Sequence, residues 1–323
     1  MSHSNRALRL RSAMHTSIGQ VRENNEDNQY LSAQETWLLA VIADGMGGAA
    51  AGEEASRMAI EAVDNMLQEH EDLLTNISSD EQIIQVLRKI IFLGNTGIVQ
   101  QATEKPEMRG MGTTITMAYV NLEHAIFAHV GDSRAYLIEY RSHNATQITN
   151  DHTFAEVLVS SRHLTREQAD EHPMRNVLYR VLGQQDELEI DIYETRFHAG
   201  DGIVLCSDGL TRHVKPHEIA DIVLANPDPE LACNVLIDLA NERGGEDNIS
   251  VIVIRVEGST ETALEDSTVE LKPVEKVKNT MSQPHVIDDE ALMGDAQTPD
   301  EETPPSNDDE NLNFMQDFLK DNL

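Results

Sequence analysis

The chain has 323 residues and a formal net charge of −33 at pH 7, from 57 acidic and 24 basic side chains. This negative charge argues against nucleic acid or an anionic membrane as a partner, because phosphate-bearing surfaces bind basic proteins. No apolar run approaches the roughly 18 residues that a membrane span needs, and the N-terminus has Arg6, Arg9 and Arg11 but no apolar core, so we expect a cytoplasmic protein without a secretion signal.

Apolar runs and helical spacings predict a mixed fold. The strands are expected, in chain order, near 15–21, 36–43, 113–120, 125–130, 134–140, 188–196, 202–207 and 249–256. The helices are expected near 52–70, 80–104, 154–160, 165–171, 217–225 and 229–243. Several strands are separated by only a few turn residues, as antiparallel neighbours are. The pattern therefore predicts an α+β fold in which two packed antiparallel β-sheets are flanked by helices, an α-β-β-α sandwich.

The composition changes near residue 256. Residues 1–11 are predicted to be a flexible N-terminus, and 12–256 have the composition of one globular domain. Residues 257–323 carry 18 acidic against 4 basic side chains and five prolines, which is typical of a mostly disordered acidic tail. Apolar residues at helical spacing predict a short amphipathic helix over 310–322, which either stays solvated or docks onto a partner.

Four aspartates stand where apolar, strand-like runs end or begin: Asp44, Asp132, Asp208 and Asp247. Gly45 follows Asp44 and Gly209 follows Asp208, and glycine lets the backbone approach a ligand closely. A further acidic pair, Glu26–Asp27, lies near the start of the domain. One Asp-Gly pair after a strand is usually a plain turn. The recurrence of the acid in the same setting predicts that these side chains share a metal site.

The ligand types indicate which ion such a site holds. Carboxylates gathered without basic partners repel one another, and a bound cation relieves that repulsion. Oxygen-only ligands favour Mg²⁺ or Mn²⁺, and the residues do not decide between the two. Zinc is disfavoured because Cys206 and Cys233 are far apart and form no Cys-x-x-Cys pair. Calcium is a weaker alternative, because the chain has no twelve-residue loop with alternating acids and a closing glutamate.

Seven short blocks carry a resemblance to a known family. In chain order they are Gly19–Asp27, Ala43–Gly48, Gly112–Thr114, Val130–Arg134, Asp151–Thr153, Cys206–Leu210 and Gly245–Ile249. With these blocks in this order, the chain resembles the metal-dependent Ser/Thr protein phosphatases of type 2C (the PPM family), particularly the bacterial members, over about residues 12–256. The resemblance implies a monomeric enzyme that hydrolyses phosphoserine and phosphothreonine in proteins and opposes a bacterial Ser/Thr kinase.

The resemblance also assigns roles to the acids. The metal ligands that it implies are Glu26, Asp27, Asp44, Gly45 through its carbonyl, Asp208 and Asp247. Asp44 would bridge two ions, Asp208 and Asp247 would complete the site of one, and the Gly45 carbonyl with one of the two N-terminal acids would help hold the other. A water shared by both ions would be the nucleophile, because two cations lower its pKa and clamp the attacking and leaving oxygens.

The resemblance draws attention to four further residues. Arg22 would grip the phosphate, because a planar guanidinium matches phosphate oxygens. Animal members carry a histidine after the Asp-Gly pair, thought to protonate the departing serine oxygen, whereas this chain has Met46, which cannot donate that proton. Bacterial members also lack the histidine and offer a third metal site involving Asp132, whose bound water is an alternative acid. Ser17 replaces an aspartate that many bacterial members carry.

Residues 147–183 align with the flap that lies beside the active site in this family. A loop and helix insertion of this kind is well placed to contact protein substrates. His152 and Arg175 are its candidate substrate residues, and the alternative is that they only hold the flap together. Two other functions were weighed for the domain. A catalytically inactive binding module is disfavoured because every metal acid is present. A metal enzyme that acts on a phosphodiester or a small phosphate is disfavoured because no basic surface for nucleic acid is apparent and because the flap favours a protein substrate.

Overall fold

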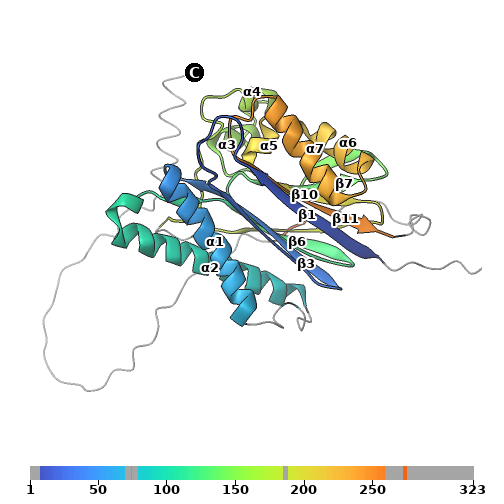
Figure 1. The fold of residues 1–323 in the computed structure, drawn as a ribbon, viewed down its shortest axis with the longest axis horizontal. Helices are drawn as coiled ribbons and strands as arrows, with labels where there is room; N and C mark the ends of the chain where they lie inside the picture. The colour runs from blue at the N-terminus through green and yellow to red at the C-terminus, as the bar shows by residue number, and fades with distance from the viewer. Residues whose placement is uncertain (1–7, 70–73, 75–78, 185–187, 259–271, 275–323) are drawn as a thin grey trace, which may run out of the picture. The chain divides into compact units, whose positions relative to one another are not determined.

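The computed structural model describes residues 8–69, 74, 79–184, 188–258 and 272–274, all within one compact unit, Met1–Thr280. Its strands form two antiparallel sheets (Figure 1). The smaller sheet has the order β1–β11–β10–β7–β8, and its strands are β1 (Arg9–Ser17), β11 (Ile249–Glu257), β10 (Gly202–Cys206), β7 (Arg134–Glu139) and β8 (Asn144–Gln147).

The larger sheet has the order β12–β9–β6–β5–β3–β2. Its strands are β12 (Lys272–Val274), β9 (Asp191–Arg196), β6 (His124–Val130), β5 (Ile115–Asn121), β3 (Trp37–Met46) and β2 (Asp27–Ala33). A two-residue strand, β4 (Gly112–Thr113), pairs with the end of β3. Every pairing in both sheets is antiparallel, which confirms the predicted sheet type.

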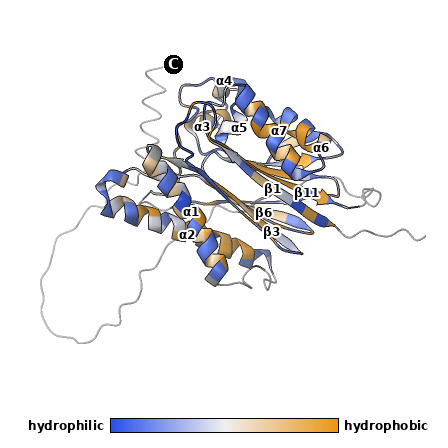
Figure 2. Cartoon of the chain, viewed as in Figure 1, coloured by the Kyte–Doolittle hydropathy of each residue, from blue (hydrophilic) through white to orange (hydrophobic). Residues whose placement is uncertain are grey.

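Two pairs of helices cover the outer faces of the sheets (Figure 1). Helices α1 (Ala49–Glu69) and α2 (Asp80–Glu104) pack on the larger sheet, and α6 (Pro216–Ala225) and α7 (Pro229–Glu242) pack on the smaller sheet. Apolar residues are interspersed with hydrophilic ones along these helices (Figure 2). This distribution is expected of helices with one face on a core and the other in water.

The apolar residues form three separate core layers. One lies between α1, α2 and the larger sheet and includes Val63 and Leu87. A second lies between the two sheets and includes Phe127, and the third lies between the smaller sheet and the helices α6 and α7 and includes Val223 and Leu236. These three core layers separate four layers of structure, in the order helix, sheet, sheet and helix. The predicted α-β-β-α sandwich is therefore confirmed.

The start and the buried face of α2 both follow from local sequence. The Ser79 side chain accepts a hydrogen bond from the Gln82 backbone N–H and so caps the helix, and Asp80 and Glu81 place negative charge in the first turn. Its buried residues recur every three to four positions: Ile83, Ile84, Leu87, Ile90, Ile91, Gly94, Asn95 and Ile98. Because of this periodicity, the bounds predicted from the sequence, 80–104, agree with those of the helix in the structure.

Several elements differ from the sequence prediction. Strand β1 begins at Arg9 and ends at Ser17, so the predicted flexible segment 1–11 is wrong for its last residues. The charged Arg9 and Arg11 occupy exposed positions of this half-buried strand. Because of these charges, the sequence does not show the apolar run that would predict a strand. The sequence does not predict β2 or β8, because half-buried strands rich in polar residues lack a continuous apolar run. Strand β12 pairs with β9 beyond residue 256, within the predicted tail.

The remaining helices are short. They are the 3₁₀ helix η1 (Pro106–Met108), α3 (Phe154–Ser160), α4 (Arg166–Asp170) and α5 (Asp208–Thr211). Helices α3 and α4 form the predicted flap segment. None of the helices in the described part of the chain combines the length and the apolar character needed to cross a bilayer. The helix expected over 310–322 lies outside the described residues.

Candidate metal centre

Three of the predicted metal acids lie where β2 and β3 pair. Asp44, near the end of β3, lies opposite Asp27, the first residue of β2. The Asp44 N–H donates to Thr114 Oγ1 at 3.0 Å, and the Thr114 N–H donates to the Asp44 carbonyl at 2.9 Å. The Gly45 N–H donates to the Glu26 carbonyl at 3.1 Å. These backbone bonds fix Glu26, Asp27 and Asp44 as one group.

Two glycines bring α1 close to this group. A Cβ on Gly45 would lie 2.1 Å from the Gly52 carbonyl oxygen, and a Cβ on Gly52 would lie 1.9 Å from Glu26 Oε2. No side chain fits at such distances, so both positions require glycine. The Glu26 carboxylate therefore lies directly against the backbone of α1.

Two further acids come from the smaller sheet. Asp208 is the first residue of α5 and follows β10, whereas Asp247 lies just before β11, the neighbour of β10 in the sheet. The Ser207 hydroxyl donates to Asp27 Oδ2 at 2.7 Å and so joins the acids of the two sheets. A cavity of about 450 Å³ opens between them, and the predicted residues that line it are Arg22, Glu26, Asp44, Gly45, Asp132, Asp208 and Asp247. Asp27 lies beneath this group and is 5% exposed.

Asn248 ties the segment before β2 to the start of β11. Its Oδ1 accepts the Glu26 N–H at 2.9 Å, and its Nδ2 donates to the carbonyls of Ile18 and Asn24, also at 2.9 Å. Its own N–H donates to Asp247 Oδ1 at 3.0 Å. One buried amide thus sets the position of Glu26 relative to Asp247.

Five carboxylates of the centre have raised pKas. Burial is the largest cause for Asp27, Asp44, Asp132 and Asp208, because it disfavours the charged form. Repulsion between neighbours adds to it: Asp27 and Asp208 both raise the pKa of Asp44. Burial likewise raises the pKa of Glu26, against the lowering effect of Arg22. The group is therefore short of positive charge, which is the electrostatic condition for binding a cation.

Two arginines supply part of that charge. Arg22 lies 2.8 Å from a carboxylate oxygen of Asp247. Arg212, on the turn that follows Asp208, pairs with Asp208 and also lies 2.9 Å from Asp247. The Arg212 guanidinium therefore occupies the space between two of the predicted metal ligands.

The donor set fits a hard divalent ion. All predicted ligand atoms are carboxylate or carbonyl oxygens, which suit Mg²⁺ and Mn²⁺. Asp27 Oδ1 is buried without a hydrogen-bond partner in the described part of the chain, and such an atom is costly unless a ligand, water or ion satisfies it. Ions held by Asp208 and Asp247 would compete with Arg212 for the same carboxylate oxygens.

Asp132 and Met46 lie at the rim of the same cavity. Asp132 follows β6, is 8% exposed and has its pKa raised by burial and then by Asp208. Met46 is 40% exposed and lines the cavity, so no proton donor occupies the position after the Asp-Gly pair. Asp132 is thus placed beside Asp208.

The flap borders a second cavity of about 530 Å³, which shares Asp132, Asn176, Asp208 and Arg212 with the first. Arg175 is exposed and lines this second cavity, so it is placed to meet a substrate. Its position next to the centre also supports the flap as a substrate-reading segment.

His152 is not placed to contact a substrate, and the structure supports the alternative that it holds the flap together. It is 1% exposed, and its Nδ1 accepts the Gly131 N–H at 3.0 Å while its Nε2 lies 3.2 Å from Asp191 Oδ2. Arg180 binds the other oxygen of Asp191 at 2.9 Å. The imidazole therefore anchors the flap to β9 and to the turn that carries Asp132.

Sequence reasoning missed two residues of the centre. Arg212 stands four positions after Asp208, a spacing at which an acid and a base meet on one helical turn, so an i,i+4 search from each metal acid would find it. Asn248 lies inside one of the quoted blocks, yet its three long-range bonds depend on the fold and leave no local signal.

Comparison with known proteins gives one consistent set of relatives. The family model of protein phosphatase 2C matches residues 14–228. The Serine/threonine phosphatase stp of Listeria monocytogenes is 36% identical over 240 residues, which are 74% of this chain and 93% of the relative. Among solved structures, Stp1 from Staphylococcus aureus matches with a TM-score of 0.71 and 33% identity, covering 80% of this chain and 99% of that chain.

A further solved structure bears on the metal. It is the catalytic domain of the serine/threonine protein phosphatase PstP in complex with two manganese ions. It matches with a TM-score of 0.66 and 35% identity, and the match covers 77% of this chain and 99% of that chain.

Proposed function

Because the chain is a member of the protein phosphatase 2C family, we propose that its strand-end acids are the catalytic centre of a metal-dependent Ser/Thr protein phosphatase. The enzyme removes phosphate from phosphoserine and phosphothreonine in proteins and uses Mn²⁺ or Mg²⁺. The catalytic domain is assigned to about residues 12–256, with its flap at 147–183.

The observation that carries this proposal is the convergence of acids from both sheets on one cavity. Asp44 comes from the larger sheet, and Asp208 and Asp247 come from the end of the smaller sheet. Glu26, Asp27 and the Gly45 carbonyl complete the oxygen ligands for two ions. When bound, such ions lower the pKa of a shared water and neutralise charge on the transferred phosphoryl group.

The side chains around the ligands bind and orient the substrate. Arg22, which lines the cavity and pairs with Asp247, is assigned to the substrate phosphate, because its planar guanidinium binds two phosphate oxygens at once. Arg175 lines the second cavity, which the flap borders, and is assigned to the substrate protein. Asp132 would help to hold a third ion, and water bound to that ion would supply the proton that the departing serine oxygen needs, since Met46 has none to give.

The partner and the setting follow from this chemistry. Phosphoserine and phosphothreonine are products of Ser/Thr kinases, so the enzyme works against such a kinase. Free, buried Cys206 and Cys233 suit a reducing cytoplasm. The large exposed apolar side chains of the described residues come from many different elements, which supports a monomer. Size-exclusion chromatography with light scattering tests the monomer, and cell fractionation tests the location.

The test of the centre is hydrolysis of a phosphothreonine peptide by the full-length protein, with Mn²⁺ and with chelator. We expect turnover with Mn²⁺ only, and a loss of at least a hundredfold in kcat for Asp208→Asn, which removes one charged ligand. Asp221→Asn, a change of the same kind on the exposed face of α6, is the matched control and keeps full activity. Equal turnover by Asp208→Asn would remove Asp208 from the centre, and chelator-resistant turnover would contradict the metal requirement.

A further inference from the structure

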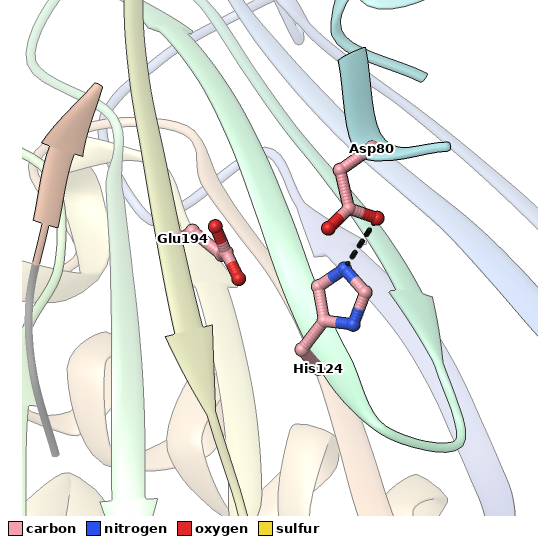
Figure 3. Close-up of side chains that lie close together, drawn as sticks. All are labelled: Asp80, His124 and Glu194. Atoms are coloured by element: carbon pink, nitrogen blue, oxygen red, sulfur yellow. Dashed lines mark ion pairs between the residues drawn. The ribbon is translucent and has the colours of Figure 1, made fainter. Parts of the chain in front are cut away.

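A second cluster of ligand-type side chains lies at the far end of the larger sheet from the catalytic centre. Asp80 is the first residue of α2, His124 is the first residue of β6, and Glu194 lies in β9, the neighbour of β6. Figure 3 shows the Asp80 carboxylate and the His124 ring facing each other, with the Glu194 carboxylate beside them. One ligand atom of each residue lies within 4.8 Å of the other two.

The cluster is separate from the catalytic centre. Strand β6 starts at His124 and leads to Asp132, eight residues further on. At a rise of about 3.3 Å per residue, the two ends of this segment are roughly 25 Å apart. The cluster also contains a nitrogen donor, whereas the ligands assigned to the catalytic centre are all oxygens.

The His124 imidazole is an unsatisfied buried group. The residue is 8% exposed. Its backbone N–H donates to Asn121 Oδ1 at 2.9 Å, which fixes the backbone position from which the side chain extends. Its Nε2 lies 3.0 Å from Asp80 Oδ1, but the approach lacks hydrogen-bond geometry, and Nε2 has no hydrogen-bond partner among the described residues. A buried nitrogen aimed at two carboxylates without a hydrogen bond is the arrangement of a metal ligand.

The separations also suit a metal. Tetrahedral zinc binds nitrogen and oxygen at about 2.0–2.2 Å, which places its ligand atoms roughly 3.4 Å apart. His124 and Asp80 already meet this spacing. The Asp80 side chain is 49% exposed, and Glu194 is partly exposed, so both carboxylates have room to close on an ion by a small rotation.

We propose that Asp80, His124 and Glu194 form a second metal site that binds a divalent transition ion of the zinc type. The imidazole gives the site its selectivity, because nitrogen favours Zn²⁺ over Mg²⁺, whereas the oxygen-only centre takes Mg²⁺ or Mn²⁺. The ion cross-links the start of α2 to β6 and β9, and solvent supplies the fourth ligand. Binding therefore raises the thermal stability of the domain.

The test is a calorimetric titration of Zn²⁺ into the full-length protein in excess Mg²⁺, which occupies the oxygen-only centre. We expect one Zn²⁺ per chain and a rise in Tm on binding. Each of the near-isosteric changes Asp80→Asn, His124→Gln and Glu194→Gln lowers the affinity at least tenfold. His15→Gln, which alters another histidine beside a carboxylate, Glu230, is the matched control and keeps the affinity of the wild type.

Two outcomes overturn the proposal. Absence of stoichiometric Zn²⁺ binding by the wild type would leave the cluster as a contact between His124 and Asp80 without a metal. Binding that survives all three substitutions would place the ion elsewhere in the chain. Mn²⁺-dependent phosphatase activity of each variant reports that it is folded, because none of the three residues lines the catalytic cavity.

Discussion

Several carboxylates of the catalytic centre lie beside a group that balances their charge or fixes their direction. The Ser207 hydroxyl orients Asp27, the Asn248 backbone N–H orients Asp247, and Arg212 lies between Asp247 and Asp208. Of these neighbours, only Arg212 carries a charge of the same sign as a metal ion. It therefore competes with the ion for the same oxygens.

Removing this competitor tightens metal binding. We expect Arg212→Gln to lower the Kd for Mn²⁺ by roughly three- to tenfold, about 1 kcal/mol, as measured by calorimetry on the full-length protein. Arg243→Gln serves as the control, because Arg243 pairs with Glu218 at the surface, away from the cavity. A Kd that stays the same or rises would show that Arg212 helps to hold the ligands in place.

The role assigned to Asp132 has its own test at this scale. We expect Asp132→Ala to lower kcat for a phosphoserine peptide by at least tenfold. It should change kcat for p-nitrophenyl phosphate little, because nitrophenolate departs without needing a proton. The comparison of kcat for the two substrates isolates the protonation step. Equal losses on both substrates would assign Asp132 to general metal binding instead.

Sequence reasoning at the residue scale succeeded where chemistry is tied to a local pattern. Asp44 and Asp208 are visible because a strand, an acid and a glycine follow one another, and the structure places both on one cavity. Arg212 was missed because an arginine four residues after an aspartate is also an ordinary surface pair. The sequence leaves the role of His152 open, because the motif does not reveal that Gly131 and Asp191 satisfy both ring nitrogens.

At the scale of elements, the flap depends on one half-buried acid beneath it. Asp191 in β9 faces His152, Arg180 and the Tyr193 hydroxyl, the last donating at 3.0 Å. Burial by itself raises the pKa of Asp191, but the bond and charge of His152 and the charge of Arg180 hold it below its ordinary range. The flap is thus anchored to the larger sheet by a charged carboxylate.

Loss of that charge loosens the flap. We expect Asp191→Asn to destabilise the domain by about 2–4 kcal/mol, because Arg180 and His152 lose their charged acceptor. The kcat/KM on a phosphoprotein falls further than that on p-nitrophenyl phosphate, since only the protein substrate reaches the flap. Asp221→Asn is again the control, and an equal fall on both substrates would argue against a substrate-reading flap.

The elements found from sequence share a simple signature. Strands β3, β5, β6 and β10 are buried along almost their whole length, so unbroken apolar runs reveal them. Strand β2 is half-buried, and its first residue is one of the proposed metal acids. It therefore lacks the continuous apolar run that would predict a strand. Strand β12 has only three residues and is specified by its partner β9, and no local pattern predicts it.

At the scale of the whole molecule, stability depends on polar groups that the layers bury in their neutral form. His129 in β6 is fully buried, with Nε2 donating to the Asn150 carbonyl at 3.1 Å and Nδ1 bonded to Thr116 at 2.9 Å. Burial, and then the neighbouring His152, lowers its pKa to about 3. The folded protein therefore keeps this imidazole neutral where the unfolded chain protonates it.

Acid consequently destabilises the fold through His129. Between the unfolded pKa, about 6.5, and the folded value the unfolded state binds the extra proton, so stability falls as pH falls. We expect His129 to account for about 2 kcal/mol of lost unfolding free energy between pH 7 and pH 5, measured by urea denaturation in chelator. His129→Gln removes this loss, and His15→Gln leaves it unchanged. The same pH dependence in both variants would refute the assignment.

The position of β11 in the smaller sheet has a consequence for synthesis of the protein. Strand β1 is among the first segments to leave the ribosome, yet its partner in the sheet is β11, more than 230 residues later. Asn248, at the start of β11, also supplies the bonds that hold the segment carrying Glu26. A nascent chain thus has no assembled metal site until its last long strand is made, so catalysis begins only once the domain is complete.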